Sequence, residues 1–253
     1  MVPMTKDDTL LAKRLIDLSR QAQQRDIVVF SDFLNLNELN IFKQEVSELY
    51  SGYELSGGYE LSERQMIAFI PDALCYTWKY PISCLKITPV NHKFAETLTH
   101  RDILGSLMNL GIERYKLGDI LVDELQSYVF CKEQIADYLK EGLNRIRHTM
   151  VTSDIVLPEA LCIEPKKELM EGIITSNRLD SIIACICKIS RSQACQWIKG
   201  GKVFLNNRQI LQTTAECKPG ELISIRSIGR FCFLDCLGET RKGRLKIQFE
   251  KYI

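Results

Sequence analysis

The residues best suited to hold a ligand lie in the last third of the chain, where basic side chains surround the expected start of a helix. Ser190 and Gln193 have the S-x-x-Q spacing of a capping box, so a helix should begin at Ser190. The first turn of a helix carries backbone N–H groups without partners, and these groups suit a phosphate. Arg191 follows the cap directly. Four further cations fall on nearby turns: Arg178, Lys188, Lys199 and Lys202.

These cations favour the phosphate backbone of RNA, gripped by shape rather than by sequence. A guanidinium group binds phosphate with two parallel hydrogen bonds, so Arg178 and Arg191 are the first candidates for phosphate contact. Further electrostatic affinity is expected from Lys188, Lys199, Lys202, Arg208, Arg226 and Arg230. The alternative interpretation is a small α/β domain with a solvated basic face.

The charge of the chain is divided unevenly along the sequence. The whole chain has a net charge of +1, but residues 176–253 have 14 Lys and Arg against 6 Asp and Glu, a net charge of +8. Residues 1–175 have 19 basic and 26 acidic residues, a net charge of −7. A basic domain attached to an acidic one indicates a polyanion as the partner of the basic end, with a chance distribution of solvated charges as the alternative.

Two short helices should position the basic residues. The first begins near Arg178 and has one apolar face made of Leu179, Ile182, Ile183 and Ile186. In the second, Ala194, Trp197 and Ile198 face inward, and Gly200 and Gly201 end it because glycine accepts a left-handed conformation. Residues 202–210 then read as a strand, a turn and a strand, 218–221 as a turn, and 222–226 as a strand.

The N-terminal part indicates a mixed α/β region. Thr5 and Asp8 predict the start of a first helix, and Asn37 is the expected cap of a second. Gly57 and Gly58 interrupt the pattern, and residues 65–70 form an apolar run typical of a strand.

The middle third has the order β-α-β-β-α-β. Strands are expected at 84–90, 119–122, 127–131 and 149–157, and helices after the Thr99/Asp102 capping pair and over 134–147. This order is the split βαβ, or ferredoxin-like, arrangement, which RNA recognition motifs share. The strand at 127–131 does not match the aromatic signature with which those motifs stack bases.

These patterns predict an α+β protein with four parts. We expect an N-terminal α/β region at 1–82, a ferredoxin-like (RRM-like) middle domain at 83–160, a connector at 161–175 that could end in a strand, and a basic C-terminal domain at 176–253. A hydrophobic content of 45% and a charged content of 26% exclude wholesale disorder.

The composition argues against membrane, secreted and metal-binding classes. The chain lacks an apolar run of about 18 residues, which a membrane-spanning helix needs, and its start lacks the pattern of a secretory signal. Ten cysteines occur without a Cys-x-x-Cys pair, so neither a disulfide scaffold nor a zinc ribbon is expected. We expect mostly reduced core thiols, a cytoplasmic location, and no metal or cofactor.

The C-terminal segment resembles the αL-motif RNA-binding domain, the module named after ribosomal small-subunit protein S-four. The resemblance covers about 75 residues and rests on Arg178-Leu179-Asp180, Ser190-Arg191, Lys202-Val203 with Asn206, and Lys218-Pro219-Gly220-Glu221. In that family the two helices and the following hairpin form the RNA surface. The resemblance therefore implies RNA contacts by Arg178, Ser190, Arg191, Gln193, Lys202 and Asn206.

The rest of the chain is similar to the YlmH family. The similarity rests on the Gly-Gly-Tyr…Glu-Arg pattern at 57–64, on the run at 100–114 followed by Gly118-Asp119-Ile120, and on Arg-Ser-Ile-Gly-Arg-Phe at 226–231. Ser227 stands where that family usually has glycine, and a serine is costly there if the position needs a positive φ. The resemblance implies a bacterial, cytosolic, RNA-binding protein of the translation apparatus. It further implies binding to large ribosomal subunits that carry peptidyl-tRNA, in ribosome-associated quality control.

Three other functions compete with RNA binding alone. The first is an RNA-modifying enzyme of the pseudouridine synthase or methyltransferase type, because Arg178-Leu179-Asp180 echoes a catalytic aspartate segment; we expect Asp180 to cap or orient its helix instead. The second is a metal or acid–base site, for which the candidate residues are His92, His100, Asp102 and His148. The third is a protein partner at the acidic N-terminal part, which is compatible with RNA binding.

Overall fold

The computed structural model describes residues 5–91, 95–123, 126–157, 167–241 and 243–252. The chain divides into two compact units, Met1–Glu164 and Pro165–Ile253. Both units combine helices with antiparallel sheets, so the α+β class is confirmed. Within the described residues, no helix has the length and apolarity that crossing a membrane requires.

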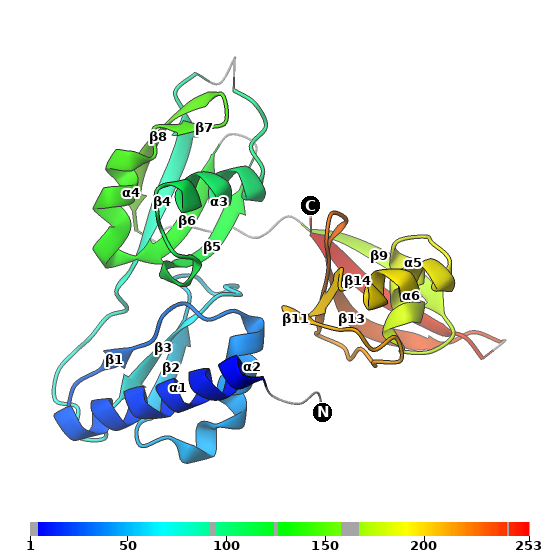
Figure 1. Cartoon of the computed structure of the whole chain (residues 1–253), viewed down its shortest axis with the longest axis horizontal. Coiled ribbons are helices and arrows are strands. Elements are labelled where there is room, and N and C mark those ends of the chain that lie inside the picture. Colours follow the sequence, from blue (N-terminus) through cyan, green and yellow to red (C-terminus); the bar gives the residue numbers. More distant parts are fainter. Residues whose placement is uncertain (1–4, 92–94, 124–125, 158–166, 242, 253) are drawn as a thin grey trace. The chain divides into compact units, whose positions relative to one another are not determined.

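The N-terminal part of the first unit is a three-stranded antiparallel sheet covered by helix α1. Its elements are α1 (Lys6–Arg25), β1 (Val29–Phe30), α2 (Leu36–Gln44), the 3-10 helix η1 (Val46–Glu48), β2 (Gly52–Ser56) and β3 (Met66–Ile70). The strand order is β1-β3-β2, and α1 packs against β1 and β3 (Figure 1). The apolar faces of α1, α2 and β3 meet in a core that contains Leu15, Phe42, Ile67 and Phe69.

Capping side chains fix where both of these helices begin. Thr5 and Asp8 form a complete capping box at α1, as the sequence predicts. The prediction that Asn37 caps the second helix is wrong, because Asn35 is the cap. The Asn35 side chain accepts hydrogen bonds from the backbone N–H groups of Asn37 and Glu38, and the Glu38 carboxylate accepts from the Asn35 N–H.

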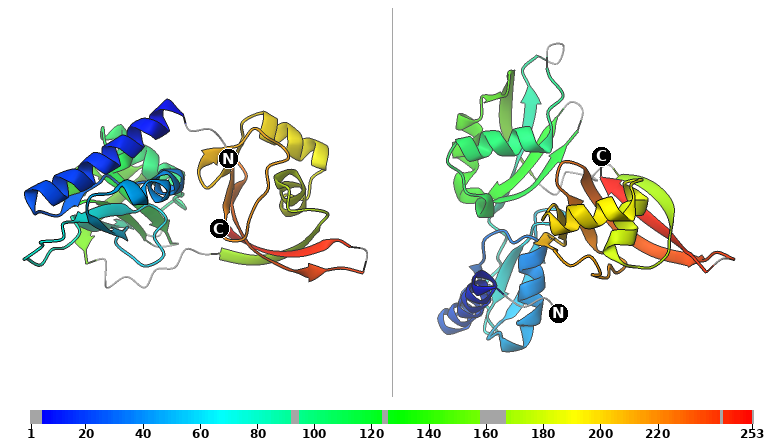
Figure 2. Two further views of the ribbon diagram at one scale, coloured as in Figure 1. Left: turned by 90° about the horizontal axis from the view of Figure 1, so that it is seen from below. Right: turned by 45° about the vertical axis from the view of Figure 1, so that its right-hand side comes forward.

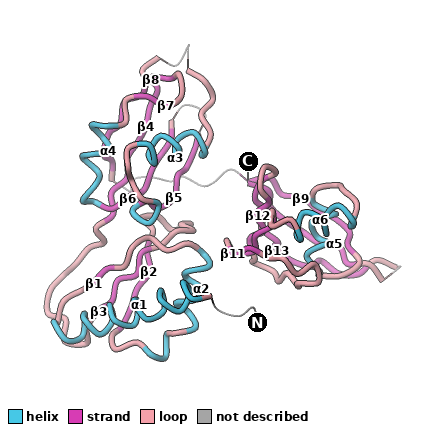
Figure 3. The backbone as a smooth tube through the Cα atoms, in the orientation of Figure 1, coloured by secondary structure: helices cyan, strands magenta, loops and turns pink. Residues whose placement is uncertain are grey.

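The middle part of the first unit has the predicted β-α-β-β-α-β order with one additional two-residue strand before the last strand. Its elements are β4 (Ile82–Pro89), α3 (His100–Asn109), η3 (Arg114–Lys116), β5 (Leu117–Val122), β6 (Ser127–Lys132), η4 (Glu133–Ile135), α4 (Ala136–Gly142), β7 (Arg145–Ile146) and β8 (Thr149–Val156). The antiparallel sheet has the order β5-β6-β4-β8-β7. Figure 3 shows α3 and α4 on one side of these strands, and their apolar side chains share a core with Leu85, Ile87 and Val129.

The predicted helix over 134–147 is wrong in its second half. Helix α4 ends at Gly142, and the chain continues through Asn144 into the short strand β7. Leu143 and Ile146 are buried as the helical pattern expects, but they reach the core from a bend and a strand. A short apolar spacing therefore suits two different backbone conformations.

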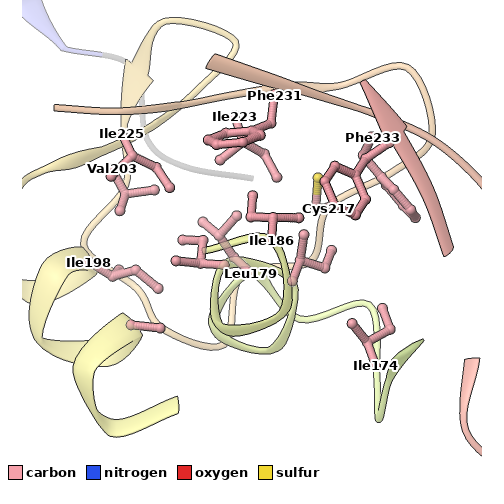
Figure 4. Packing of buried hydrophobic residues seen from close by; sticks show 14 of the residues in the cluster. Ile174, Leu179, Ile186, Ile198, Val203, Cys217, Ile223, Ile225, Phe231 and Phe233 are labelled. Carbon is pink, nitrogen blue, oxygen red and sulfur yellow. The ribbon is translucent and has the colours of Figure 1, made fainter. Parts of the chain in front are cut away.

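The second unit is a six-stranded antiparallel sheet with two helices on one face. Its elements are β9 (Lys167–Ile174), α5 (Leu179–Ile186), α6 (Arg191–Lys199), β10 (Val203–Leu205), β11 (Arg208–Gln209), β12 (Leu222–Ile225), β13 (Gly229–Glu239) and β14 (Leu245–Tyr252), and the strand order is β11-β10-β12-β13-β14-β9. Figures 1 and 2 show α5 and α6 beside each other against the strands. Figure 4 shows Leu179 and Ile186 of α5 pointing toward Ile223 and Phe231 of the sheet.

Strands β13 and β14 of this sheet lie outside the sequence expectations, whereas β9 is the strand in which the connector was expected to be able to end. The long pair β13 and β14 was not predicted, and its buried residues occupy only part of each strand. Strand β9 falls within the expected connector at 161–175 and pairs along its whole length with β14. The C-terminal unit therefore begins before residue 176. The start of the connector, with Cys162 and Pro165, lies outside the described residues.

Three of the nine described cysteines are buried, so the expectation that most of them are core thiols holds only in part. Cys84, Cys131 and Cys217 are buried among apolar side chains. Burial raises the pKa of the Cys84 and Cys131 thiols to about 12. These thiols are therefore neutral near pH 7 and act as small hydrophobic groups.

Candidate nucleic-acid interface

Two arginines from different helices converge on one buried carboxylate. Asp180 lies in the first turn of α5 and is only 2% exposed. The Arg178 Nε donates to Asp180 Oδ1 at 3.1 Å and its Nη2 donates to Oδ2 at 3.2 Å. The Arg191 Nη2 donates to the same Oδ2 at 2.8 Å. We call Arg178 and Arg191 the guanidinium pair.

The outer edges of the guanidinium pair face solvent. The side chains of Arg178 and Arg191 are 40% and 48% exposed, whereas that of Asp180 is 3% exposed. Each arginine therefore uses part of its fork of donors on Asp180 and keeps the rest outward. A phosphate can bind to such outward donors without the loss of side-chain freedom that an unfixed arginine would suffer.

The same contacts keep the Asp180 carboxyl group ionised. Burial favours its neutral form, but hydrogen bonds from Arg191 and Arg178 outweigh burial and set the pKa of Asp180 below the usual range. The Cys195 thiol adds a weak contact to Oδ2 at 3.7 Å. Asp180 is thus a carboxylate at neutral pH. Of the two roles expected of Asp180, to cap or to orient its helix, the capping role is wrong, since Arg178 is the N-cap of α5.

The start of α6 lies next to the guanidinium pair. Ser190 is its N-cap, and the Ser190 hydroxyl accepts from the Gln193 N–H at 3.2 Å. The predicted capping box is only half formed, because among the described residues the exposed Gln193 side chain does not return a bond to Ser190. Lys188 is exposed and has a φ of 53° at the end of α5, where its backbone completes the turn into α6. These residues and the pair form the helix-start group: Arg178, Lys188, Ser190, Arg191 and Gln193.

Other predicted residues form a second group at the far end of α6. Lys199 closes this nine-residue helix and Lys202 follows it, so both are roughly 12 Å or more along the axis from Arg191. Both lysines are exposed. The Arg226 N–H donates to the Lys202 carbonyl at 2.9 Å, which brings Arg226 into this group. Gly201, with a φ of 67°, supplies the left-handed turn that the sequence predicts at the helix end.

Two predicted arginines stack on aromatic rings of the sheet. The Arg226 guanidinium lies over the Phe204 ring at 5.0 Å, and that of Arg230 lies over Tyr252 at 5.5 Å. Their neighbours Ile225 and Phe231 point into the core. Phe204 and Arg230 alternate along their strands with the core residues Val203 and Phe231, so both stacked guanidinium groups lie over the sheet face that is turned away from α5 and α6. The predicted RNA-binding residues therefore do not form one continuous patch.

Both polar atoms of the Asn206 side-chain amide form hydrogen bonds within the protein. It forms with Asn207 the two-residue turn between β10 and β11, where φ is 49° and 64°. The Asn206 Nδ2 donates to the Glu221 carboxylate at 3.2 Å, and its Oδ1 accepts from the Leu222 N–H at 2.9 Å. Arg208 follows the turn and is partly buried. RNA contacts by these two residues stay a prediction.

The comparisons with known proteins concern first the middle part of the chain. Residues 77–156 match the family model described as "Putative RNA-binding domain in YlmH". The chain is also 25% identical, over 97% of its length and 96% of the relative, to "Ribosome-associated protein quality control protein P2" of Bacillus subtilis (strain 168). These two matches confirm the similarity to the YlmH family that the sequence indicates. The family model ends before the C-terminal unit, whose relation to the αL-motif module stays a prediction.

A solved structure of a YlmH protein is similar to part of this chain. The structure is "Cell division protein ylmH from Streptococcus pneumoniae", with a TM-score of 0.51 and 25% sequence identity. The match covers 62% of this chain and 94% of that chain.

The Gly-Gly-Tyr…Glu-Arg segment of the YlmH resemblance joins the two parts of the first unit. Asp119, at the start of β5, accepts hydrogen bonds from the Tyr59 hydroxyl at 2.9 Å and from the Glu63 N–H at 2.7 Å. Burial raises the pKa of Asp119, although these hydrogen bonds favour its ionised form. The second YlmH segment, at 100–114, supplies helix α3 and the turn before β5.

Arg64 also joins the two parts of the first unit. Its guanidinium donates to the backbone carbonyls of Phe33 and Leu117, each at 2.9 Å, and of Arg114 at 3.3 Å. Burial lowers the pKa of Arg64, and the nearby carboxylates of Glu38 and Asp119 oppose that shift. We call Tyr59, Glu63, Arg64 and Asp119 the clasp. Sequence reasoning found these residues only through the family resemblance.

The third YlmH segment contains a strained serine. Ser227 has a φ of 67°, so the position does require the left-handed conformation that glycine adopts easily. We expect Ser227→Gly to raise the free energy of unfolding of the C-terminal unit by about 0.5–1 kcal/mol. Urea unfolding checks this in a Trp78→Phe background, where Trp197 is the single tryptophan and reports on that unit.

The control for this prediction is Ser176→Gly, which changes a serine of the same unit that does not have a positive φ. Glycine there should leave stability unchanged or lower it, because it only increases the freedom of the unfolded chain. Equal effects of the two substitutions would contradict strain at Ser227.

Proposed function

We propose that this protein is a non-enzymatic RNA-binding protein of the ribosome. Its ligand would be structured rRNA, tRNA or both, on the large ribosomal subunit, and its role would lie in translation or in ribosome-associated quality control. The matched YlmH domain and the name of the Bacillus relative support the RNA and ribosome parts of this proposal. A cytoplasmic site of action belongs to the same proposal.

The observation that carries the proposal is the guanidinium pair. Two arginines are fixed by one buried carboxylate, and their free donors face outward on a segment with a net charge of +8. Such donors bind phosphate oxygens, which fix position on an RNA without reading its sequence. The neighbouring start of α6 adds backbone N–H groups that suit the same ligand.

The experiment is co-sedimentation with separated ribosomal subunits over a salt series. Wild-type protein should bind the large subunit, and log K should fall with log salt at a slope of about −3 to −5 if roughly four to six phosphates are neutralised. The Arg178→Ala/Arg191→Ala variant should lose most of this binding, because it lacks both fixed guanidinium groups.

The matched control removes two arginines elsewhere in the same unit. Arg241 and Arg244 are exposed near the turn between β13 and β14, so Arg241→Ala/Arg244→Ala has the same net charge as the test variant. Equal losses in the two variants would indicate a diffuse electrostatic effect. A flat salt response of the wild type would contradict a grip on the phosphate backbone.

The competing RNA-modifying activity has less support. A catalytic aspartate must reach its substrate, whereas Asp180 is buried and engaged by two arginines. Within the described residues no three His, Cys, Asp or Glu side chains are placed to hold a metal ion, and His92 lies outside those residues. A protein partner for the acidic first unit remains part of the proposal.

A further inference from the structure

The two faces of the sheet in the middle domain differ in what they can offer to RNA. In proteins of this architecture, aromatic rings on the open face of the sheet stack the bases of single-stranded RNA. Here α3 and α4 cover one face of the sheet. The opposite face carries Cys84, Leu121, Tyr128 and Phe130, and this face is the first candidate for RNA contact.

The chain itself occupies the centre of that open face. The Tyr59 ring is stacked on Phe130, with 4.8 Å between the ring centroids and 25° between the planes. Gly58 brings Tyr59 there with a φ of 94°, and a Cβ on Gly58 would lie 2.7 Å from the Phe130 ring. The Tyr59 hydroxyl is held by Asp119. A base would have to displace the clasp before it could stack on Phe130.

Exposed arginines gather instead at one end of the domain. Arg101 lies in the first turn of α3, and Arg145 and Arg147 lie on the hairpin of β7 and β8; all three are exposed. Strand β7 is in contact with α3. The ion pairs of Arg147 with Glu96 at 3.5 Å and with Asp102 at 3.7 Å tie the hairpin to the start of α3.

The backbone conformation at Arg147 and a hydrogen bond from Arg145 orient the arginines of the hairpin. Arg147 has a φ of 52°, a conformation that glycine favours and that costs an arginine energy. The Arg145 Nε donates to the Arg147 carbonyl at 2.8 Å, so the remaining Arg145 donors are left for another partner. Among the described residues, the Arg101 side chain makes neither a hydrogen bond nor an ion pair. Strained residues of this kind are frequent at functional sites.

We propose that the middle domain contacts the phosphate backbone of RNA through this arginine end, Arg101, Arg145 and Arg147, and not through the open face of its sheet. This inference rests on the proposed function. Residues 1–175 have a net charge of −7, so most of the first unit repels RNA and a local group of arginines decides where RNA can approach. The arginine end would be a second contact besides the guanidinium pair.

The test compares three variants of the full chain, with purified large subunits and with the rRNA extracted from them as probes. Arg101→Gln/Arg145→Gln removes two charges from the arginine end. The control variant, Lys79→Gln/Lys116→Gln, removes two charges near the starts of β4 and β5. These positions are distant from the arginine end, because the hairpin lies at the other end of β4, where the Val90 N–H donates to the Met150 carbonyl. Lys86→Gln removes the cation on the open face of β4.

We expect the arginine-end variant to bind about tenfold more weakly and to reduce the magnitude of the salt slope by about 2, whereas the other two variants bind like the wild type. Arg101→Gln alone should give part of the loss. This variant removes no side-chain hydrogen bond seen in the described residues and leaves the hairpin unchanged, so its effect cannot come from misfolding of the hairpin. Equal binding of the arginine-end and lysine variants would overturn the inference. A loss confined to Lys86→Gln would overturn it in favour of the sheet face.

Failure of the proposed function would give a different pattern of binding results. In that case the wild type binds neither the large subunit nor its rRNA, and the proposal falls together with the inference. If the wild type binds and the Arg178→Ala/Arg191→Ala variant does not, but the arginine-end variant matches its control, only the inference is wrong.

Discussion

Replacing Asp180 with alanine is expected to weaken binding to the large ribosomal subunit about tenfold, although the variant gains one positive charge. A purely electrostatic surface would bind more tightly after the loss of a carboxylate. Asp180, however, fixes the guanidinium pair through three hydrogen bonds. Without it Arg178 and Arg191 must be ordered by the RNA itself, and a loss of about 1.4 kcal/mol corresponds to tenfold in affinity. Co-sedimentation at fixed salt measures the effect.

The matched control for Asp180→Ala is Asp235→Ala. Asp235 is an exposed residue of β13 in the same unit, so its removal changes the net charge equally without touching the guanidinium pair. We expect this control to bind as tightly as the wild type or slightly more tightly. Tighter binding by both variants would show that charge alone governs affinity and that the fixed geometry is irrelevant. Asp180→Asn adds a further check, since it keeps the shape but loses the charge.

Replacing Arg64 with alanine is expected to lower the free energy of unfolding of the first unit by roughly 3 kcal/mol. Three backbone carbonyls, on Phe33, Arg114 and Leu117, would lose the donor that joins them. Urea unfolding in a Trp197→Phe background isolates this unit, because Trp78 is then the single tryptophan and packs on Phe30 and Tyr80.

Two further variants define what Arg64 contributes. Arg64→Lys should recover little stability, because one ammonium group cannot reach carbonyls that lie in three directions as a planar guanidinium does. Arg20→Ala removes an exposed arginine that pairs with Asp17, and should cost less than about 1 kcal/mol. If Arg64→Ala cost no more than Arg20→Ala, the clasp would not hold the two parts of the unit together.

The elements that the sequence predicted well are those whose signals are local. The Thr5/Asp8 and Thr99/Asp102 capping boxes lie within one helical turn, and each marked the start of its helix. The β-α-β-β-α-β order also followed from the spacing of apolar residues. The same kind of signal misplaced the cap of α2 by two residues and extended α4 too far, since several backbones can satisfy a short apolar pattern.

The sequence by itself determined which residue types are available for a nucleic-acid interface: cations concentrated in the last third of the chain, with Arg178 and Arg191 at two helix starts. Only the tertiary structure decided that Asp180 fixes both arginines, that Arg226 and Arg230 face away from them, and that Tyr59 covers Phe130. The contacts of Arg191 with Asp180 and of Tyr59 with Phe130 join different elements of the fold, and the direction of Arg230 depends on which side of its strand faces the core. Such contacts arise from packing between elements, and the spacing of residues along one element does not specify them.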